Sequence, residues 1–185
     1  MAKVYVFLAN GVEEIEALAV VDILRRGGLD VVTVSVTGKK EIQGSHGIAF
    51  SADALFDEDG FEDGDMVVLP GGGRGTNALM AHEGLRNLLM AYRDEDKYIT
   101  AICAAPSVLG MNGLLKGRKA TCYPGFEDKL LGAKVSTDPV VQDGNIITGK
   151  GMGVAIPFAL KLLSAFPRRK PRRSEKQFSL QPELL

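Results

Sequence analysis

The stretch 98–107, Tyr98-Ile99-Thr100-Ala101-Ile102-Cys103-Ala104-Ala105-Pro106-Ser107, joins a strand pattern to a helix pattern. Its first half is an apolar run with β-branched residues, which predicts a buried strand. Its second half has small residues and a proline, which suit the first turn of a helix. A side chain at such a junction projects above the carboxyl end of a sheet, as in a nucleophile elbow. Cys103 is therefore a candidate nucleophile, and a buried structural cysteine is the alternative.

The composition indicates one soluble domain. The chain has 185 residues, 45% of them hydrophobic, and a formal net charge of −1. These values favour neither a disordered chain nor a nucleic-acid-binding protein. Two cysteines, Cys103 and Cys122, are too few for a disulfide framework, and the first residues lack the pattern of a secretory leader. No apolar run is long enough to span a bilayer. We expect a cytoplasmic domain with reduced thiols and no membrane partner.

Apolar runs alternate with helical patterns along most of the chain. We expect strands at 4–9, 31–36, 66–69 and 98–102 and helices at 12–26, 77–92 and 154–165. A hairpin at the edge of the sheet is expected at 39–50, and a second hairpin at 140–148, where Asp143-Gly144 supplies the positive φ angles of a tight turn. The alternation predicts an α/β fold with a mainly parallel sheet covered on both faces.

The character of the chain changes after Phe166. A basic run interrupted by prolines begins at Pro167 and is followed by a polar segment. We therefore expect a domain at 1–166 and a basic polar tail at 167–185. Binding to nucleic acid or to an acidic surface is the alternative, but a solvated terminus is favoured.

Glycine-rich stretches do not complete a nucleotide-binding motif. The stretch 71–76 has Thr76 where a dinucleotide fingerprint needs its third glycine. The stretch 144–150 imitates a phosphate loop, but Gly151 replaces the Ser or Thr that would hold magnesium. We expect no cofactor. Gly71 and Gly72 are better interpreted as a loop whose backbone N–H groups approach a developing oxyanion.

Glu16 interrupts an apolar helix face. It lies one and two turns before Val20 and Leu24, on the stripe that should face the sheet. A carboxylate there is costly unless it is paired or protonated. We interpret Glu16 as a carboxyl group that reaches the nucleophile; a half-exposed residue at the edge of the stripe is the alternative. Glu13 and Glu14 are explained as ordinary first-turn charges.

The two histidines do not neighbour Cys103 in sequence. His46 falls in the edge hairpin and His82 near the start of a helix, so structural or solvent-facing roles are favoured for both. Two histidines and two cysteines without paired spacing favour no metal site. The helix N-terminus after Cys103 and a protonated Glu16 would instead stabilise a thiolate. Such a thiolate adds to small carbonyls and is easily oxidised.

Four motifs occur together in an order that resembles a known superfamily. They are Asn-Gly-Val-Glu-Glu-Ile-Glu at 10–16, Leu-Pro-Gly-Gly at 69–72, Ala-Ile-Cys-Ala-Ala-Pro at 101–106 and Thr-Gly-Lys-Gly-Met-Gly at 148–153. In this order they resemble the ThiJ/PfpI superfamily, and most of all its branch with the human parkinsonism-associated protein, from about Lys3 to Ala165. The resemblance implies a flavodoxin-like three-layer α/β/α sandwich and a homodimer.

The resemblance also implies roles for particular residues. Cys103 would be the reactive, oxidation-prone cysteine, with Glu16 as its hydrogen-bonded carboxyl partner. Backbone N–H groups near Gly72 and Ala104 would form a small anion pocket. Activities of the family include cofactor-free conversion of methylglyoxal to lactate, deglycation of glyoxal adducts, peroxide sensing and chaperone-like holding.

Tyr123, Ala104 and the basic tail depart from patterns found in the superfamily, and these departures bear on which of its functions to expect. Tyr123 stands where some members place a histidine near the nucleophile, so Tyr123 or Glu16 would have to serve as the base. Ala104 follows the cysteine, where the protease branch has a histidine, and the basic tail differs from the apolar end of this branch. We expect a cysteine-dependent enzyme that acts on small reactive carbonyls such as methylglyoxal or glyoxal, as a glyoxalase or deglycase and not as a protease. The alternative is a non-catalytic redox sensor or chaperone-like protein that uses the same cysteine.

Overall fold

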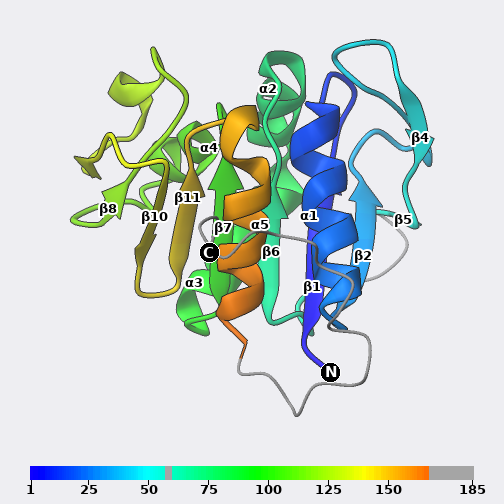
Figure 1. The fold of residues 1–185 in the computed structure, drawn as a ribbon, viewed down its shortest axis with the longest axis horizontal. Coiled ribbons are helices and arrows are strands. Elements are labelled where there is room, and N and C mark those ends of the chain that lie inside the picture. The colour runs from blue at the N-terminus through cyan, green and yellow to red at the C-terminus, as the bar shows by residue number, and fades with distance from the viewer. Residues whose placement is uncertain (57–59, 167–185) are drawn as a thin grey trace.

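The structure is a computed structural model that describes residues 1–56 and 60–166. The basic tail expected at 167–185 lies outside the described residues. A seven-stranded sheet forms the centre of the molecule, in the order β10-β11-β7-β6-β1-β2-β5 (Figure 1). Its strands are β1 (Lys3–Leu8), β2 (Asp30–Ser35), β5 (Ala54–Leu55), β6 (Met66–Leu69), β7 (Tyr98–Ile102), β10 (Val140–Asp143) and β11 (Ile146–Gly149).

Each neighbouring pair in this sheet is parallel except β10 and β11. The five strands β2, β1, β6, β7 and β11 have the order of flavodoxin-like sheets. The order in which strands are added to the sheet reverses between β1 and β6, and open α/β sheets hold their ligands at the carboxyl ends of strands beside such a point. The expected fold class, a flavodoxin-like α/β sandwich with a mainly parallel sheet, is confirmed.

Helices cover both faces of the sheet. Helices α1 (Glu14–Arg26) and α5 (Ala155–Ser164) lie side by side on one face (Figure 1). The other face is covered by α2 (Gly73–Ala81), α3 (Glu83–Asp94) and α4 (Pro106–Met111). Alternate residues of β1 serve the two cores: Val4 and Val6 pack with α1 and α5, whereas Tyr5 and Phe7 pack with α3. This division follows from the period of two along a strand.

The expected single helix at 77–92 is wrong, because the structure has two helices that meet at His82. His82 has the extended backbone of an N-cap residue, with φ −82° and ψ 106°. Its ring nitrogen Nδ1 accepts a hydrogen bond from the Leu85 N–H at 3.0 Å, and its ring packs edge-on against Phe56. Histidine is not a preferred cap by composition. The break therefore has no clear signal in the sequence.

The hairpin expected at 39–50 forms, but it does not extend the central sheet. Strands β3 (Glu41–Gln43) and β4 (Ala49–Ser51) make a separate antiparallel pair, and the short strand β5 occupies the edge of the large sheet. The β3–β4 hairpin instead contacts the loop that leads into α1. The Gly11 N–H donates to Gln43 O, and the Ser45 N–H donates to Val12 O. A second small sheet pairs β8 (Lys119–Ala120) with β9 (Lys134–Val135).

The second hairpin is confirmed with a small shift in its turn. Asp143 and Ile146 are its last paired residues, so Gly144 and Asn145 are the central turn residues. Gly144 has a φ of +60°, and it is the one residue of 143–145 with a positive φ. A positive φ at the first central position is typical of a type II′ turn. The prediction that Asp143 also adopts a positive φ is therefore wrong.

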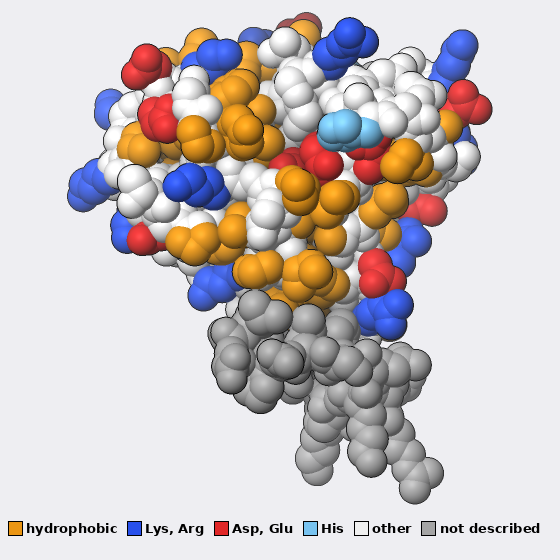
Figure 2. All heavy atoms as spheres, turned by 45° about the horizontal axis from the view of Figure 1, so that its top comes forward, with side chains coloured by type: hydrophobic (Ala, Val, Ile, Leu, Met, Phe, Trp, Pro, Cys, Tyr) orange, Lys and Arg blue, Asp and Glu red, His pale blue; other side chains and the backbone are white. Residues whose placement is uncertain are grey.

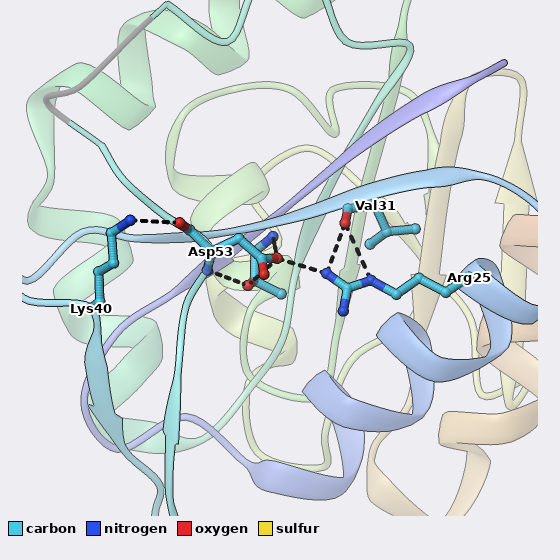
Figure 3. A network of polar contacts seen from close by, with 5 residues as sticks. Arg25, Val31, Lys40 and Asp53 are labelled. Carbon is cyan, nitrogen blue, oxygen red and sulfur yellow. Dashed lines mark hydrogen bonds and ion pairs between the residues drawn. The ribbon is translucent and has the colours of Figure 1, made fainter.

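A polar network fixes the end of α1 against β2 and the segment before β5 (Figure 3). The Asp53 carboxylate accepts hydrogen bonds from Arg25 Nη2 at 2.6 Å and from the Thr33 N–H and hydroxyl at 2.8 and 2.7 Å. Arg25 also donates to Val31 O, and Lys40 Nζ donates to Asp53 O. Partial burial opposes ionisation, but the Thr33 hydrogen bonds and the Arg25 charge outweigh it and lower the pKa of Asp53.

Two short 3₁₀ turns, at Glu127–Lys129 and Met152–Val154, complete the elements. No helix in the described part of the chain combines the length and the apolarity needed to cross a membrane.

Candidate functional site

Three segments that are far apart in sequence meet at the carboxyl ends of the central strands. Glu16 lies in the first turn of α1, after β1; Gly71 follows β6; and Cys103 follows β7. If Gly71 carried a Cβ atom, that atom would lie 2.5 Å from both Cys103 Cβ and Glu16 Oε2. The structure thus brings together the two side chains that the sequence analysis singled out, with the Gly71 backbone beside them.

Cys103 occupies a sharp turn between strand and helix. Its φ is +65°, in the left-handed region that costs energy for a residue with a side chain. The turn is held on both sides, because the Cys103 N–H donates to Gly149 O at 2.9 Å and Cys103 O accepts from the Tyr123 N–H at 2.8 Å. Its side chain is only partly buried. This is the backbone geometry expected of a nucleophile elbow.

Glu16 is fully buried, as its place on the apolar stripe predicts. Its Oε2 accepts a hydrogen bond from the Gly71 N–H at 2.9 Å, whereas Oε1 has no hydrogen-bond partner among the described residues. Burial opposes the charged form and raises the pKa of Glu16 to about 7, although hydrogen bonds from Cys103 and Gly71 favour the carboxylate. The carboxyl group therefore exchanges a proton near neutral pH.

The Cys103 side chain and the Glu16 carboxyl group both lie directly against Gly71, close enough for each to influence the ionisation of the other. Burial and the nearby Glu16 carboxylate raise the pKa of Cys103 to about 12, while the backbone N–H groups of Gly72 and Ala104 act in the opposite direction. The expectation of a thiolate that is already formed at neutral pH is thus not met in the resting site. A neutral Glu16 removes the repulsion, so the protonated carboxyl group favours the thiolate.

The glycines after β6 are required by close packing. A side chain at Gly71 would collide with Cys103 and Glu16, as described above. Gly72 has a φ of +89°, and a Cβ there would lie 2.6 Å from the Glu13 nitrogen. Its backbone N–H group and that of Ala104 act to lower the pKa of the Cys103 thiol. These are the two amides that the sequence analysis placed in an anion pocket.

Neither histidine is a partner of Cys103. His82 caps α3, and the His46 ring Nδ1 lies 2.9 Å from Glu14 Oε2. The prediction that Glu14 is an ordinary first-turn charge is wrong, since Glu14 is 3% exposed and also accepts hydrogen bonds from the His46 N–H and the Ser45 hydroxyl. Burial disfavours its charge, but these hydrogen bonds outweigh that effect and lower the pKa of Glu14 to about 2.

Glu13, Glu14 and His46 each place one ligand-type atom within 4.8 Å of the others, and they are the one such group among the described residues. Glu14 and His46 are engaged in hydrogen bonds that fasten the β3–β4 turn to α1, and Glu13 Oε2 accepts a hydrogen bond from the Glu16 N–H at the start of the same helix. We therefore assign this cluster to the attachment of the hairpin.

Tyr123 and Cys122 lie next to the site, and they differ in how far their side chains are exposed. Tyr123 is bound to Cys103 through its backbone, and its side chain is half exposed. Cys122 is 4% exposed, and burial raises the pKa of its thiol to about 11. Of the two cysteines, Cys103 is the more accessible.

One residue of the site was missed by the sequence analysis. Glu13 is the N-cap of α1: its Oε2 accepts from the Glu16 N–H at 2.7 Å, and its own N–H donates to Gly71 O at 3.0 Å. An acidic residue just before a helix is a known capping signal, and Glu13 lies three residues before Glu16. That signal indicates the start of the helix but not the contact with Gly71.

Comparisons with known proteins agree with this fold. The family model described as DJ-1/PfpI family matches residues 2–165. The protein DJ-1 homolog A of Arabidopsis thaliana is 40% identical over 169 residues, which are 91% of this chain but 43% of that protein. The chain thus spans less than half the length of this relative.

Two further matches extend over most of both proteins. A deglycase of Pyrococcus horikoshii is 33% identical over 150 residues, which cover 80% of this chain and 89% of that enzyme. The solved structure of oxidized DJ-1 from Toxoplasma gondii superposes with a TM-score of 0.86 at 37% identity and covers 89% of this chain and 90% of that one.

Proposed function

The chain belongs to the DJ-1/PfpI family, and from that premise we propose that it is a cysteine-dependent enzyme that converts small reactive carbonyl compounds without a cofactor. Methylglyoxal, glyoxal and their early adducts are the substrate class. The relative that is named a deglycase supports this class. The observation that carries the proposal is the fully buried Glu16 carboxyl group, which lies with the Cys103 side chain against Gly71 and keeps one oxygen without a hydrogen-bond partner among the described residues.

In the proposed reaction, the Cys103 sulfur bonds to the aldehyde carbon of methylglyoxal while the thiol proton passes to the Glu16 carboxylate. The carbonyl oxygen becomes an oxyanion and takes this proton from Glu16, which gives a neutral hemithioacetal. The Gly72 and Ala104 amides stabilise the negative charge during this step. Glu16 then moves a proton from the first to the second carbon, and water releases lactate from the resulting thioester. Methylglyoxal plus water gives lactic acid, so the reaction consumes no external oxidant or reductant.

The pKa of Glu16, at about 7, suits this role. A group that both accepts and donates a proton works best when its pKa lies near the operating pH. Neither histidine reaches Cys103, so Glu16 is the base that we assign to the reaction. Tyr123 is assigned no proton transfer. We further propose that the protein works in a reducing, cytoplasmic environment, because only a reduced Cys103 can add to a carbonyl.

The test is steady-state turnover of methylglyoxal by the unaltered protein, by Cys103→Ser and by Glu16→Gln. We expect both variants to lose activity by about 10²-fold or more, the range that general acid–base catalysis contributes, with folding retained by circular dichroism. Cys122→Ser is the matched control and should stay active. Undiminished turnover in Cys103→Ser would exclude the proposal.

A non-catalytic redox response of the same cysteine is the second candidate function. Cys103 is partly exposed while Cys122 is buried, and a similar structure is described as an oxidized DJ-1. Intact-mass analysis after mild peroxide treatment should place the first oxygen atoms on Cys103. First oxidation of Cys122 or of a methionine would contradict this alternative.

We also propose a homodimer. Helices α1 and α5 present hydrophobic side chains on one face (Figure 2). The exposed residues there include Ile15, Leu18 and Ile156, with exposed fractions of 51%, 42% and 44%. A surface with several exposed aliphatic side chains is typical of a protein–protein contact.

A further inference from the structure

Glu13 contacts Gly71 through its backbone and the Glu16 backbone through its side chain. Its N–H donates to Gly71 O at 3.0 Å, while the Gly71 N–H donates to Glu16 Oε2 at 2.9 Å. The two polar groups of Gly71 are therefore both held by the first turn of α1. Because Gly71 lies directly against Cys103, a shift of this turn would move all three groups of the site.

The Glu13 side chain adds a second constraint. Its Oε2 accepts the Glu16 N–H at 2.7 Å, which fixes the backbone from which the Glu16 side chain projects. The side chain is 12% exposed, so its negative charge is only weakly screened by water.

The neighbouring Glu14 differs from Glu13 in its charged and polar partners. Its carboxylate contacts the His46 ring at 2.9 Å and also accepts hydrogen bonds from the His46 N–H and the Ser45 hydroxyl. Glu13 Oε1 is 4.0 Å from the same His46 ring nitrogen. The His46 ring nitrogen therefore lies closer to the Glu14 carboxylate than to that of Glu13. The titratable groups that act on Glu16 are Cys103, from the β7–α4 turn, and Glu13, from its own helix.

We propose that Glu13 is a positioning residue for the Glu16–Cys103 pair, which it serves by holding Gly71 and the start of α1 in place and by placing a negative charge on the helix turn that carries Glu16. The inference rests on the proposed function in taking this pair as the reacting groups. It adds that a residue outside the pair, Glu13, contributes to the proton affinity of Glu16. Repulsion by the Glu13 carboxylate supports it, since this contributes to the raised pKa of Glu16.

The test separates the charge of Glu13 from its capping role. Glu13→Gln keeps an oxygen for the Glu16 N–H but removes the charge, whereas Glu13→Asp keeps both a capping carboxylate and the charge. Glu14→Gln removes one charge from the same helix turn and is the matched control. The measurement is the pH titration of the Glu16 carboxyl carbon by ¹³C NMR, with the signal assigned through its loss in Glu16→Gln.

We expect the Glu16 midpoint to fall by about half a pH unit or more in Glu13→Gln, and to stay close to the unaltered value in Glu13→Asp and Glu14→Gln. At a fixed pH near 7, alkylation of Cys103 by iodoacetamide should be slower in Glu13→Gln, because a larger ionised fraction of Glu16 disfavours the thiolate. An unchanged midpoint in a folded Glu13→Gln, or an equal fall in Glu14→Gln, would overturn the inference. Should Glu13→Gln not fold, a lowered midpoint in Glu13→Asp overturns it and an unchanged one supports it.

Neither measurement requires turnover. If the unaltered protein does not convert methylglyoxal, the proposed function fails while the titration still decides the role of Glu13. If turnover is found and the midpoint does not move, the inference about Glu13 fails alone.

Discussion

Glu16 is the residue whose environment departs most from that of an ordinary glutamate. It has no exposed surface, and its pKa of about 7 lies well above the ordinary value of 4.5. Between these two values the folded protein holds a proton that the unfolded chain has released. Linkage then requires that stability fall as the pH rises through this interval.

We therefore expect the unaltered protein to lose stability between about pH 4.5 and pH 7, because of Glu16, by an amount on the order of 3 kcal/mol. Glu16→Gln cannot ionise and should lack this loss, so its stability relative to the unaltered protein should increase from pH 5 to pH 8. Urea unfolding at both pH values measures the difference. A constant difference would mean that Glu16 titrates with an ordinary pKa in the folded protein.

At the scale of elements, the site depends on how α1 is fixed at its two ends. At its start, Glu13 caps the helix and Glu14 binds the turn of the β3–β4 hairpin. At its end, Arg25 joins Asp53, which also receives two hydrogen bonds from Thr33 (Figure 3). These contacts tie α1 to the edge of the molecule and keep its first turn against the site.

Replacement of Asp53 tests the contribution of this network. Asp53→Asn removes the charge that three donors share, and the free energy of unfolding should fall by about 1–2 kcal/mol at pH 7, because Asp53 is about half exposed. The lowered pKa of Asp53 means that its contribution is present at neutral pH and is lost on acidification, so the difference should shrink below about pH 4.

Asp22→Asn is the control, since Asp22 forms a single exposed ion pair with Arg26 on the same helix. Its effect should stay below about 0.5 kcal/mol. Equal losses in the two variants, measured by thermal or urea unfolding, would show that the shared hydrogen bonds at Asp53 add nothing to an ordinary surface pair.

At the scale of the whole molecule, both faces of the sheet are covered, yet the outer surface of α1 and α5 keeps its exposed aliphatic side chains (Figure 2). Ile48, in the β3–β4 hairpin, is also 55% exposed. This surface lies beside the contact between Glu14, at the start of α1, and His46, in the hairpin. A second copy bound there would therefore lie close to that contact.

The homodimer prediction is tested by Leu18→Glu, which places a charge on the exposed face of α1. We expect a dimer for the unaltered protein and a monomer for this variant at micromolar concentration, because burial of the new carboxylate would be unfavourable. Sedimentation velocity measures the masses. Leu131→Glu, at a residue that is 51% exposed outside these two helices, should remain dimeric. A monomeric unaltered protein contradicts the prediction, and a dimer that survives Leu18→Glu places the contact elsewhere.

The sequence by itself determined the fold class, and it singled out the two residues that we propose as the reacting pair. Apolar runs such as 66–69 predict buried strands because strands covered on both faces need no polar positions, and this strand was predicted with its observed bounds. Cys103 and Glu16 were found because each departs from its local pattern: a cysteine at a strand-to-helix junction, and a carboxylate on an apolar stripe. Both signals are local, so one chain suffices to detect them.

Only the tertiary structure decided which contacts these residues make and how they are protonated. The break at His82, the burial of Glu14 and the contact of Glu13 with Gly71 all depend on segments distant in sequence, respectively Phe56, the β3–β4 turn and the loop after β6. The protonation of Glu16 and Cys103 likewise depends on burial and on the distance between charges, which are properties of the packed molecule. The sequence places a cysteine and a carboxyl group at the carboxyl ends of the strands, and tertiary packing buries them against each other and raises the pKa of both.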